Sequence, residues 1–318
     1  VEFNFGLIRP EGSKLGSSSG KAPGPIPLQN AMQKITELLN DCVNSGRDNL
    51  RTIDAYDIIM HASDAVLSGG VRRSATICLF SPDDLDMATA KTGNWFNENP
   101  QRGRSNNSAL LIRDKTSYEQ FATLMESVKE YGEPGFVWSD STELMVNPCV
   151  EIGMWPVCEV TGESGWSFCN LCEINGKKVK TEEDFQIAAK AAAIIGTLQS
   201  GYDQFDYLGD VTTRIVRREA LLGVSITGMQ DSPDILFDAK LQRKMAKMIL
   251  KVNELIAAKI GVNVCARATC VKPAGTTSCI LGTASGIHAH HARRYIRRSQ
   301  ANYLEAPCRH FKEVNPTA

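Results

Sequence analysis

The sequence predicts an α/β fold in which much of the sheet is parallel. Segments with apolar residues at helical spacing alternate along the chain with short apolar runs that are typical of buried strands. Such alternation is expected of a sheet covered by helices. The chain has 318 residues, of which 42% are hydrophobic. That is enough for one large barrel-like domain or for two smaller domains.

The first third of the chain is predicted to contain a loop, two helices and two strands. The run from Gly12 to Pro27 is rich in Gly, Ser and Pro, and it predicts a surface loop. Apolar residues at helical spacing then predict one helix from Leu28 and a second from Thr52. Apolar runs at 75–80 and 107–112 predict buried strands.

Three further helix starts are predicted from capping signals. One pairs a serine with a proline in the first helical position, and the other two have the spacing of a capping box. The expected starts are Ser81-Pro82, Thr116 with Glu119, and Thr181 with Asp184, and the last two helices should end near Tyr131 and Ser200.

The remaining elements complete the alternation of helices and strands. Strands are expected at 135–138, 149–154, 168–174, 223–229 and 269–272, and a long helix at 238–260.

Composition excludes several classes of protein. The net charge of −1 argues against a general nucleic-acid-binding protein, which needs a basic face. The longest apolar stretches are too short to cross a membrane, and the first residues of the sequence do not have the pattern of a signal peptide. Ten cysteines in a chain with this otherwise ordinary composition indicate metal or redox chemistry more than structural disulfides.

The segment Asn147-Pro148-Cys149-Val150-Glu151-Ile152 is the first candidate site. On a strand, Asn147, Cys149 and Glu151 would share one face, because side chains repeat every two residues. A carboxylate beside a thiol can act as a general base on a substrate hydroxyl, and an amide can hold a second hydroxyl. The alternative is a buried cysteine with two polar neighbours.

The pair Cys169-Asn170-Leu171-Cys172 has the Cys-x-x-Cys spacing of half a zinc site or of a redox pair. A second such pair is missing, since Cys265 and Cys270 have four residues between them. On a strand, Cys169 and Cys172 would also point to opposite faces. We therefore expect no metal site.

Three segments are weaker candidates. A strand leading into Lys272-Pro273-Ala274-Gly275-Thr276-Thr277-Ser278 could expose N–H groups to a phosphate, or could simply begin a helix. Gly69-Gly70-Val71-Arg72-Arg73-Ser74 could bind an anion. The stretch from Gly282 through Gly286 predicts a flexible or tightly packed turn, followed by a basic surface strand. His288 and His290 could alternatively bind a metal, although no nearby carboxylate completes such a site in the sequence.

In this order and spacing, the segments resemble the catalytic subunit of ribonucleotide reductases, above all the adenosylcobalamin-dependent class. The likeness covers nearly the whole chain, and no single piece decides it. Besides the segments already quoted, it is carried by Ser105-Asn106-Asn107-Ser108, Gly132-Glu133-Pro134-Gly135, Gly223-Val224-Ser225-Ile226-Thr227-Gly228 and Tyr295-Ile296-Arg297-Arg298.

The resemblance implies a fold, an activity and a role for each segment. It implies a ten-stranded α/β barrel of the ribonucleotide reductase and glycyl radical type, with residues 1–318 as one catalytic domain that is incomplete at both ends. A finger loop would carry Cys149 as the thiyl radical that takes the 3′ hydrogen of a ribonucleotide. Glu151 would accept the 3′ hydroxyl proton, Asn147 would hold the hydroxyls and Cys169 would supply reducing equivalents.

Other residues are assigned by resemblance alone. Ala274, Gly275, Thr276, Thr277 and Ser278 would hold the substrate phosphates, and Arg102 and Arg104 would lie in a loop that senses a deoxyribonucleotide effector. The implied cofactor is adenosylcobalamin, and the implied reductant is a thioredoxin-type protein or a small thiol. A homodimer or a complementing chain is a possible assembly, and the expected location is the cytoplasm of a bacterium or of a virus-infected host.

The chain also departs from the family pattern, which leaves alternatives open. The family's second reducing cysteine precedes the segment resembling residues 1–9, and its final strand and C-terminal cysteine pair follow the last residue here. A non-catalytic, nucleotide-binding portion of a split reductase is therefore one alternative. A glycyl radical enzyme and a zinc-binding structural protein are others. The choice between diphosphate and triphosphate substrates, and the radical source, stay open.

Overall fold

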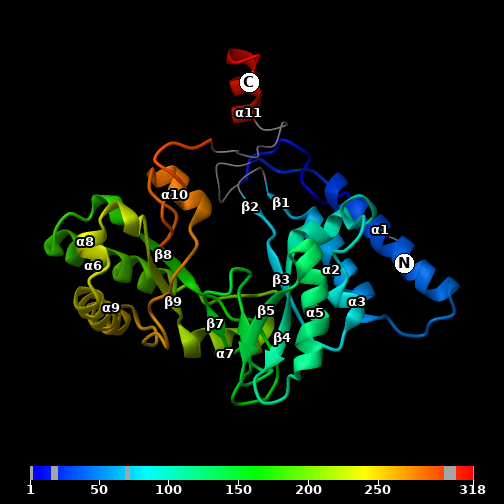
Figure 1. Ribbon diagram of the computed structural model, residues 1–318, viewed down its shortest axis with the longest axis horizontal. Helices are drawn as coiled ribbons and strands as arrows, with labels where there is room; N and C mark the ends of the chain where they lie inside the picture. The colour runs from blue at the N-terminus through cyan, green and yellow to red at the C-terminus, as the bar shows by residue number, and fades with distance from the viewer. Residues whose placement is uncertain (1–2, 16–20, 69–71, 297–305, 318) are drawn as a thin grey trace. The chain divides into compact units, whose positions relative to one another are not determined.

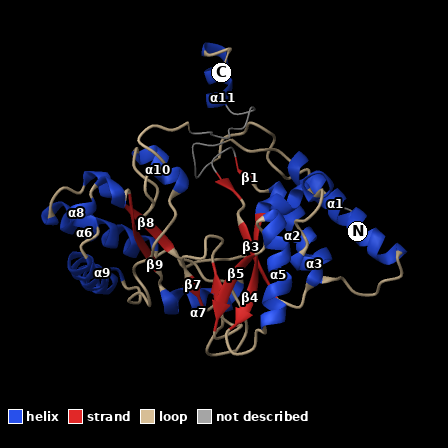
Figure 2. Cartoon of the chain, in the orientation of Figure 1, coloured by secondary structure: helices blue, strands red, loops and turns tan. Residues whose placement is uncertain are grey.

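The structure is a computed structural model that describes residues 3–15, 21–68, 72–296 and 306–317. It divides into two compact units, Val1–Asp140 with Ile296–Ala318 (unit 1) and Ser141–Tyr295 (unit 2). Helices and strands alternate in groups along the chain, and Figure 2 distinguishes them by colour. The predicted α/β fold is thus confirmed.

Unit 1 is built on a parallel three-stranded sheet in the order β3-β4-β5. Its core joins α2, α5 and this sheet, with Met60, Leu111 and Leu124 fully buried. The elements are α1 (Ile26–Asn44), α2 (Thr52–Ala65), β1 (Leu67–Ser68), β2 (Arg72–Arg73), β3 (Thr76–Phe80), α3 (Leu85–Ala88), α4 (Trp95–Glu98), η1 (Pro100–Arg104), β4 (Ser105–Ile112), α5 (Tyr118–Tyr131), β5 (Gly135–Ser139) and α11 (Ala306–Val314).

Unit 2 is built on the parallel pair β8-β9, and α6 and α9 pack together on one face of it (Figure 1). Phe185, Met245 and Ile249 fill this core. The elements are β6 (Met145–Val146), β7 (Gly153–Met154), β8 (Asn170–Asn175), η2 (Gly176–Lys178), α6 (Glu182–Gln199), α7 (Gly209–Glu219), β9 (Leu222–Thr227), η3 (Met229–Asp231), α8 (Pro233–Leu236), α9 (Ala239–Ile260) and α10 (Gly275–Leu281).

A third stretch of chain runs beside β9 on the side away from β8. The N–H of Leu222 donates to the carbonyl of Arg267 (3.0 Å), and the N–H of Val224 donates to that of Ala268 (2.9 Å). The N–H of Cys270 returns a bond to the carbonyl of Val224 (3.0 Å). This stretch forms only one isolated parallel bridge, Val224 with Thr269, so the strand predicted at 269–272 is wrong.

Most other predicted elements are confirmed within one or two residues, and three expectations fail for local reasons. The helix after Ser81-Pro82 begins only at Leu85, because the Asp84 side chain accepts the N–H of Met87 (3.0 Å). The cap of α5 is Ser117 and not Thr116, whose hydroxyl donates back to the Ile112 carbonyl (2.9 Å). Cys149 lies in a turn, outside any strand.

The structure leaves the larger architecture of the fold as a prediction. Among the described residues, each sheet has two or three strands, so the ten-stranded barrel and the single domain over residues 1–318 both stay predictions. The predicted loop at 12–27 lies partly outside the described residues, as do the glycines of the 69–74 segment. No helix in the described part of the chain is both long and apolar enough to cross a lipid bilayer.

Candidate active site

The site begins at the tip of the hairpin formed by β6 and β7. The N–H of Val150 donates to the carbonyl of Asn147 (2.8 Å), which closes a turn with Pro148 in its second position and Cys149 in its third. Val150 adopts a φ of 65°, a left-handed conformation that β-branched residues rarely adopt. The turn therefore holds Cys149 at an exposed tip, with strained backbone directly after it.

Asn147 ties this loop together. Its side-chain N–H donates to a carboxylate oxygen of Glu151 (2.6 Å), and its side-chain carbonyl accepts the N–H of Ile152 (3.0 Å). The structure thus brings Asn147 and Glu151 into contact beside Cys149, as predicted. It does so through a loop and not through the shared face of a strand.

A second group of side chains lies on the face of β8-β9 that points away from α6 and α9. Cys172 and Ile174 of β8, with Leu222 and Val224 of β9, belong to the core under the helices. Alternation along each strand therefore directs the residues between them to the other face. We call this the thiol face, and it carries Cys169, Glu173, Gly223, Ser225, Cys270 and Lys272.

Two thiols of this face approach the same residue, Gly223. A methyl group placed on Gly223 would lie 2.8 Å from the sulfur of Cys169 and 3.4 Å from the sulfur of Cys270. Real Cβ atoms do not come as close as the first distance, so a side chain at position 223 would displace Cys169. The Cδ2 atom of Leu171 would lie closer still, at 2.6 Å, so three side chains already fill the space above Gly223.

An ion pair stands beside the thiols. The Lys272 ammonium contacts one carboxylate oxygen of Glu173 (2.5 Å), and the two side chains are only 17% and 7% exposed. The other oxygen of Glu173 is buried and has no hydrogen-bond partner among the described residues. A buried carboxylate oxygen without a hydrogen-bond partner lowers the stability of the folded chain unless a ligand or a water molecule donates to it.

Burial and nearby carboxylates keep the three thiols protonated. Burial, followed by the charges of Cys270 and Glu151, raises the pKa of Cys169 to about 12. Burial, followed by Glu151, raises the pKa of Cys270 to about 11. The pKa of Cys149 is also raised, by partial desolvation first and the Glu151 charge second, although this residue is exposed. Lys272 opposes all three shifts.

The predicted phosphate-binding residues form the start of α10, a helix of seven residues. Ala274 adopts a left-handed conformation (φ 49°) and provides no side-chain cap, so the first N–H groups of the helix lack a partner within it. Gly275 and Thr276 are exposed, and Thr277 is half-buried. Ser278 is turned inward, and its buried hydroxyl donates to the Gly275 carbonyl (2.7 Å).

The turn from Gly282 to Gly286 is tightly packed. The sequence had predicted either a flexible or a tightly packed turn here. Ala284 is buried, and a methyl group on Gly286 would come within 2.4 Å of the Lys272 carbonyl. The N–H groups of Gly228 and Met229 donate to the Gly286 carbonyl (3.1 and 3.2 Å). This turn fixes the chain between Lys272 and α10 against the end of β9.

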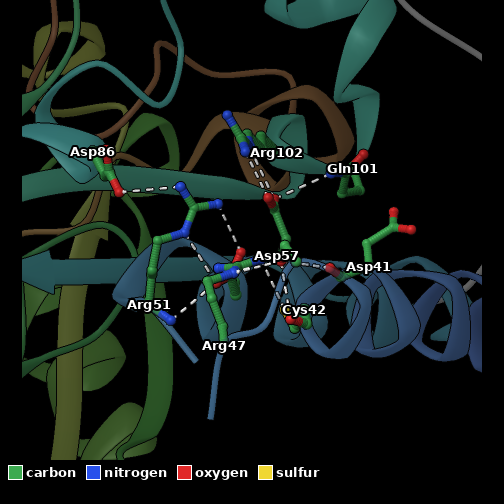
Figure 3. A network of polar contacts seen from close by, with 10 residues as sticks. Asp41, Cys42, Arg47, Arg51, Asp57, Asp86, Gln101 and Arg102 are labelled. Atoms are coloured by element: carbon green, nitrogen blue, oxygen red, sulfur yellow. Dashed lines mark hydrogen bonds and ion pairs between the residues drawn. The ribbon is translucent and has the colours of Figure 1, made fainter. Parts of the chain in front are cut away.

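The two arginines assigned to an effector loop are both engaged in unit 1. Arg102 donates from two nitrogens to Asp57 (2.9 and 2.6 Å) and from the third to the Ala90 carbonyl (2.7 Å), as Figure 3 shows for the Asp57 contacts. The ε nitrogen of Arg104 donates to Asp64 (2.5 Å), and the side chain is 39% exposed. Their role in effector binding stays a prediction.

No cluster of metal-binding side chains occurs among the residues that the structure describes. Cys172 points into the core, where its sulfur lies 3.5 Å from the position of a methyl group on Gly196 of α6. Cys169 lies on the opposite face, as the sequence predicted. His290 contacts Asp231 (3.2 Å).

Sequence reasoning missed three residues of the thiol face. Cys270 was considered only as a zinc ligand with Cys265, and Lys272 only as the start of a phosphate loop, while Glu173 was not singled out. Residues separated by an even number of positions lie on the same face of a strand. Cys270 and Lys272 have this spacing, and so do Cys169 and Glu173, so the sequence did contain the signal. It could be used only once the neighbouring stretches were known.

Comparisons with known proteins agree with the predicted resemblance. The adenosylcobalamin-dependent ribonucleoside-triphosphate reductase of Lactobacillus delbrueckii subsp. bulgaricus is 26% identical over 341 residues, which cover 92% of this chain and 43% of the relative. The enzyme of the same name from Levilactobacillus brevis is 27% identical over 337 residues, covering 94% and 43%. The chain thus spans less than half the length of these curated relatives. No protein-family model matches the chain.

Solved structures show the same fold relationship. A crystal structure of a B12-dependent, class II ribonucleotide reductase superposes with a TM-score of 0.65 and 24% identity, covering 89% of this chain and 43% of that one. The class Id ribonucleotide reductase alpha subunit of Actinobacillus ureae gives a TM-score of 0.50 with 14% identity, covering 84% and 58%. Over 92% of its length, the chain is therefore similar to adenosylcobalamin-dependent ribonucleoside-triphosphate reductases, as its ordered motifs predicted.

Proposed function

We propose that this chain carries the reaction centre for reducing ribonucleotides to 2′-deoxyribonucleotides by a thiyl-radical mechanism. The observation that carries the proposal is the hairpin tip. It places a thiol held in its protonated form next to a carboxylate that Asn147 orients through a 2.6 Å hydrogen bond. A hydrogen-atom carrier must hold its hydrogen, and the raised pKa of Cys149 meets that need.

Each residue of the tip has a separate task in this proposal. Cys149 exchanges a hydrogen atom with the 3′ carbon of the ribose and regains it at the end of the cycle. Glu151 accepts the proton of the 3′ hydroxyl as a general base. Asn147 orients the Glu151 carboxylate and has a second side-chain N–H for a substrate hydroxyl. Cys169 supplies reducing equivalents when the 2′ hydroxyl leaves as water.

Adenosylcobalamin fits this arrangement as the source of the radical. The Cys149 thiol is exposed at the tip of a hairpin and is kept as S–H, so a group bound outside the hairpin can reach it. When bound, the cofactor would supply the radical that oxidises this thiol, which is chemistry that side chains cannot start alone. Cys149 is the residue of this chain that would face it.

The substrate phosphates are proposed to bind at the start of α10. The uncapped N–H groups of its first turn and the exposed Gly275 and Thr276 support this placement, together with the likeness of this segment to the reductases. Ala274, Thr277 and Ser278 would shape the turn. Whether the substrate is a diphosphate or a triphosphate is a question for the assay below.

The partners of the reaction are also proposals. We propose a deoxyribonucleotide effector near Arg104, and a thioredoxin-type protein or small thiol as reductant. A homodimer or a complementing chain would complete the barrel, and the reaction would take place in the cytoplasm.

The test is deoxyribonucleotide formation by the purified chain with adenosylcobalamin, a dithiol and each ribonucleoside di- and triphosphate. We expect product with the native chain and with Cys172→Ala, whose thiol points into the core. Cys149→Ala should lower the rate by about 10³-fold or more, because it removes the group on which every later step depends. Nucleotide binding without product would contradict catalysis by this chain and favour the binding portion of a split reductase.

A further inference from the structure

Two buried oxygens of β8 have no hydrogen-bond partner among the described residues. They are Oε2 of Glu173 and Oδ1 of Asn175, and both are shielded from solvent. The Glu173 side chain as a whole is only 7% exposed. Because the two residues are two positions apart on one strand, their side chains leave β8 on the same face. Asn175 therefore extends the thiol face toward the end of β8.

The neighbouring strand does not supply the missing donors. β9 places Ser225 opposite Glu173 and Thr227 opposite Asn175. Each of these two hydroxyl oxygens accepts a backbone N–H, at 3.1 and 3.3 Å, and neither hydroxyl donates to the two oxygens of β8. Leaving two buried acceptors without donors is unfavourable, so a donor from outside these strands is expected to meet them.

The charge around these oxygens favours a neutral donor. The Lys272 ammonium contacts the other carboxylate oxygen of Glu173, so the two charges already balance. A bound cation would add an uncompensated charge to a buried pair, which is costly, whereas a neutral group would add none. In the part of the chain that the structure describes, no cluster of metal-binding side chains forms there either.

A hydroxyl group has the hydrogen-bonding capacity that this place requires. A water molecule can donate to both Glu173 and Asn175, and its oxygen can accept one of the three N–H groups of the Lys272 ammonium. Buried water molecules typically make about three such bonds to otherwise unsatisfied polar groups. A hydroxyl group of a ligand can make the same contacts with one donor fewer.

We propose that Glu173, Asn175 and Lys272 form a binding site for one hydroxyl donor, supplied by a water molecule or by a sugar hydroxyl of a bound nucleotide. The site lies beyond the residues to which the proposed function gives a task. Its water-filled form is independent of that function, and only the nucleotide as a source rests on it.

Crystal structures of the full chain, with and without cytidine triphosphate, test the site directly. We expect electron density for an oxygen about 2.6–3.2 Å from Oε2 of Glu173, and at a similar distance from Asn175 or Lys272. Density in both crystals identifies a water molecule, and a sugar hydroxyl at this place in the complex identifies the nucleotide. The proposal is overturned if neither crystal has an oxygen there.

A variant of Asn175 examines whether the three residues act together. Leucine is close to asparagine in shape but has no polar atoms, so Asn175→Leu should remove the density and leave the ion pair of Lys272 and Glu173 in place. Gln186→Ala, which removes an amide of α6 that contacts Glu182, is the matched control and should leave the density unchanged. Density that persists at full occupancy in Asn175→Leu would contradict the site.

Calorimetric titration distinguishes the two sources of the hydroxyl. Cytidine triphosphate is compared with its 2′,3′-dideoxy analogue, which lacks both sugar hydroxyls. If the nucleotide is the source, Asn175→Leu should reduce the preference for cytidine triphosphate by about tenfold, since the site loses an acceptor. If water is the source, the preference should stay the same while the density is present.

The same titration separates this site from the proposed function. Density in the nucleotide-free crystal, with no binding of either nucleotide, would sustain the site and contradict the proposed function. An unchanged preference in Asn175→Leu, with no density in the native crystals, would overturn the site and leave the proposed function untouched.

Discussion

Two buried ion pairs, one in each unit, are built in opposite ways. In unit 1, Asp57 accepts three hydrogen bonds from Arg102 and Gln101 (Figure 3). The remaining Arg102 nitrogen donates to the Ala90 carbonyl. In unit 2, the pair of Lys272 and Glu173 leaves one buried carboxylate oxygen without a partner among the described residues. Both pairs are similarly shielded, with side chains at most 17% exposed.

The difference indicates what each pair is for. A network in which each of these polar groups is paired holds the surrounding elements in place. A buried carboxylate with an unpaired oxygen, on the face that also carries two thiols, can still accept a hydrogen bond from a ligand. We therefore assign the first pair to folding and the second to the site.

The largest expected effect is on the fully paired network. Asp57→Ala strands the Arg102 guanidinium in a buried position, and it should lower the free energy of unfolding by about 3–5 kcal/mol. Chemical denaturation of the full chain, with hydrogen exchange read by mass spectrometry over residues 53–112, measures it. Glu37→Ala breaks an exposed ion pair and serves as the control, with no measurable change expected. A small loss for Asp57→Ala would remove the contrast between the two pairs.

The next effect is on the reactivity of Cys270 in unit 2. Its pKa is raised from 9.0 to about 11, so at pH 8 its thiolate fraction should be on the order of 100-fold lower in the folded chain than in the urea-unfolded chain. Iodoacetamide labelling at matched pH measures this ratio, corrected for a denaturant-treated model thiol. Because the raised pKa favours the protonated thiol in the fold, stability should be lost as the pH rises from about 9 to about 11. Equal labelling in the two states would contradict the shielding of this face.

A third effect isolates the charge of Lys272. This ammonium lowers the pKa of Cys149, Cys169 and Cys270, so Lys272→Met should raise all three pKa values. Iodoacetamide labelling of these three thiols at pH 8 should then slow, by about tenfold for each unit by which the pKa rises. Lys178→Met, which removes an exposed charge from η2, is the matched control. Faster labelling in Lys272→Met would mean that the ion pair opens and exposes the thiols.

The smallest effect compares the two units at their capping boxes. Ser117 caps α5 in unit 1 and Thr181 caps α6 in unit 2, each with reciprocal side-chain bonds to the third residue of the helix. Ser117→Ala and Thr181→Ala should each cost about 1 kcal/mol, measured by denaturation. Unequal losses would show that one unit depends on its helix more strongly than the other.

Local patterns in the sequence predicted most elements, because their causes lie within a few residues. The helical spacing from Leu28 and the capping box at Thr181 are both present as expected. Errors arose where neighbouring residues competed for the same role. Ser117 replaced Thr116 as a cap because the Thr116 hydroxyl bonds back to Ile112. The turn at Cys149 was expected from resemblance, while its residue alternation alone had favoured a strand.

The sequence by itself determined which chemical groups the site contains, and the tertiary structure decided which of them meet. Asn147, Cys149 and Glu151 are close in sequence, so a single loop brings them together whichever conformation it adopts. Cys169, Gly223 and Cys270 are separated by about 50 residues at each step, and nothing local relates them. Only the pairing of β8 with β9, and of β9 with the stretch after Ala266, places two thiols over one glycine. Register between distant strands is set by packing of the whole core, and a local pattern cannot carry that information.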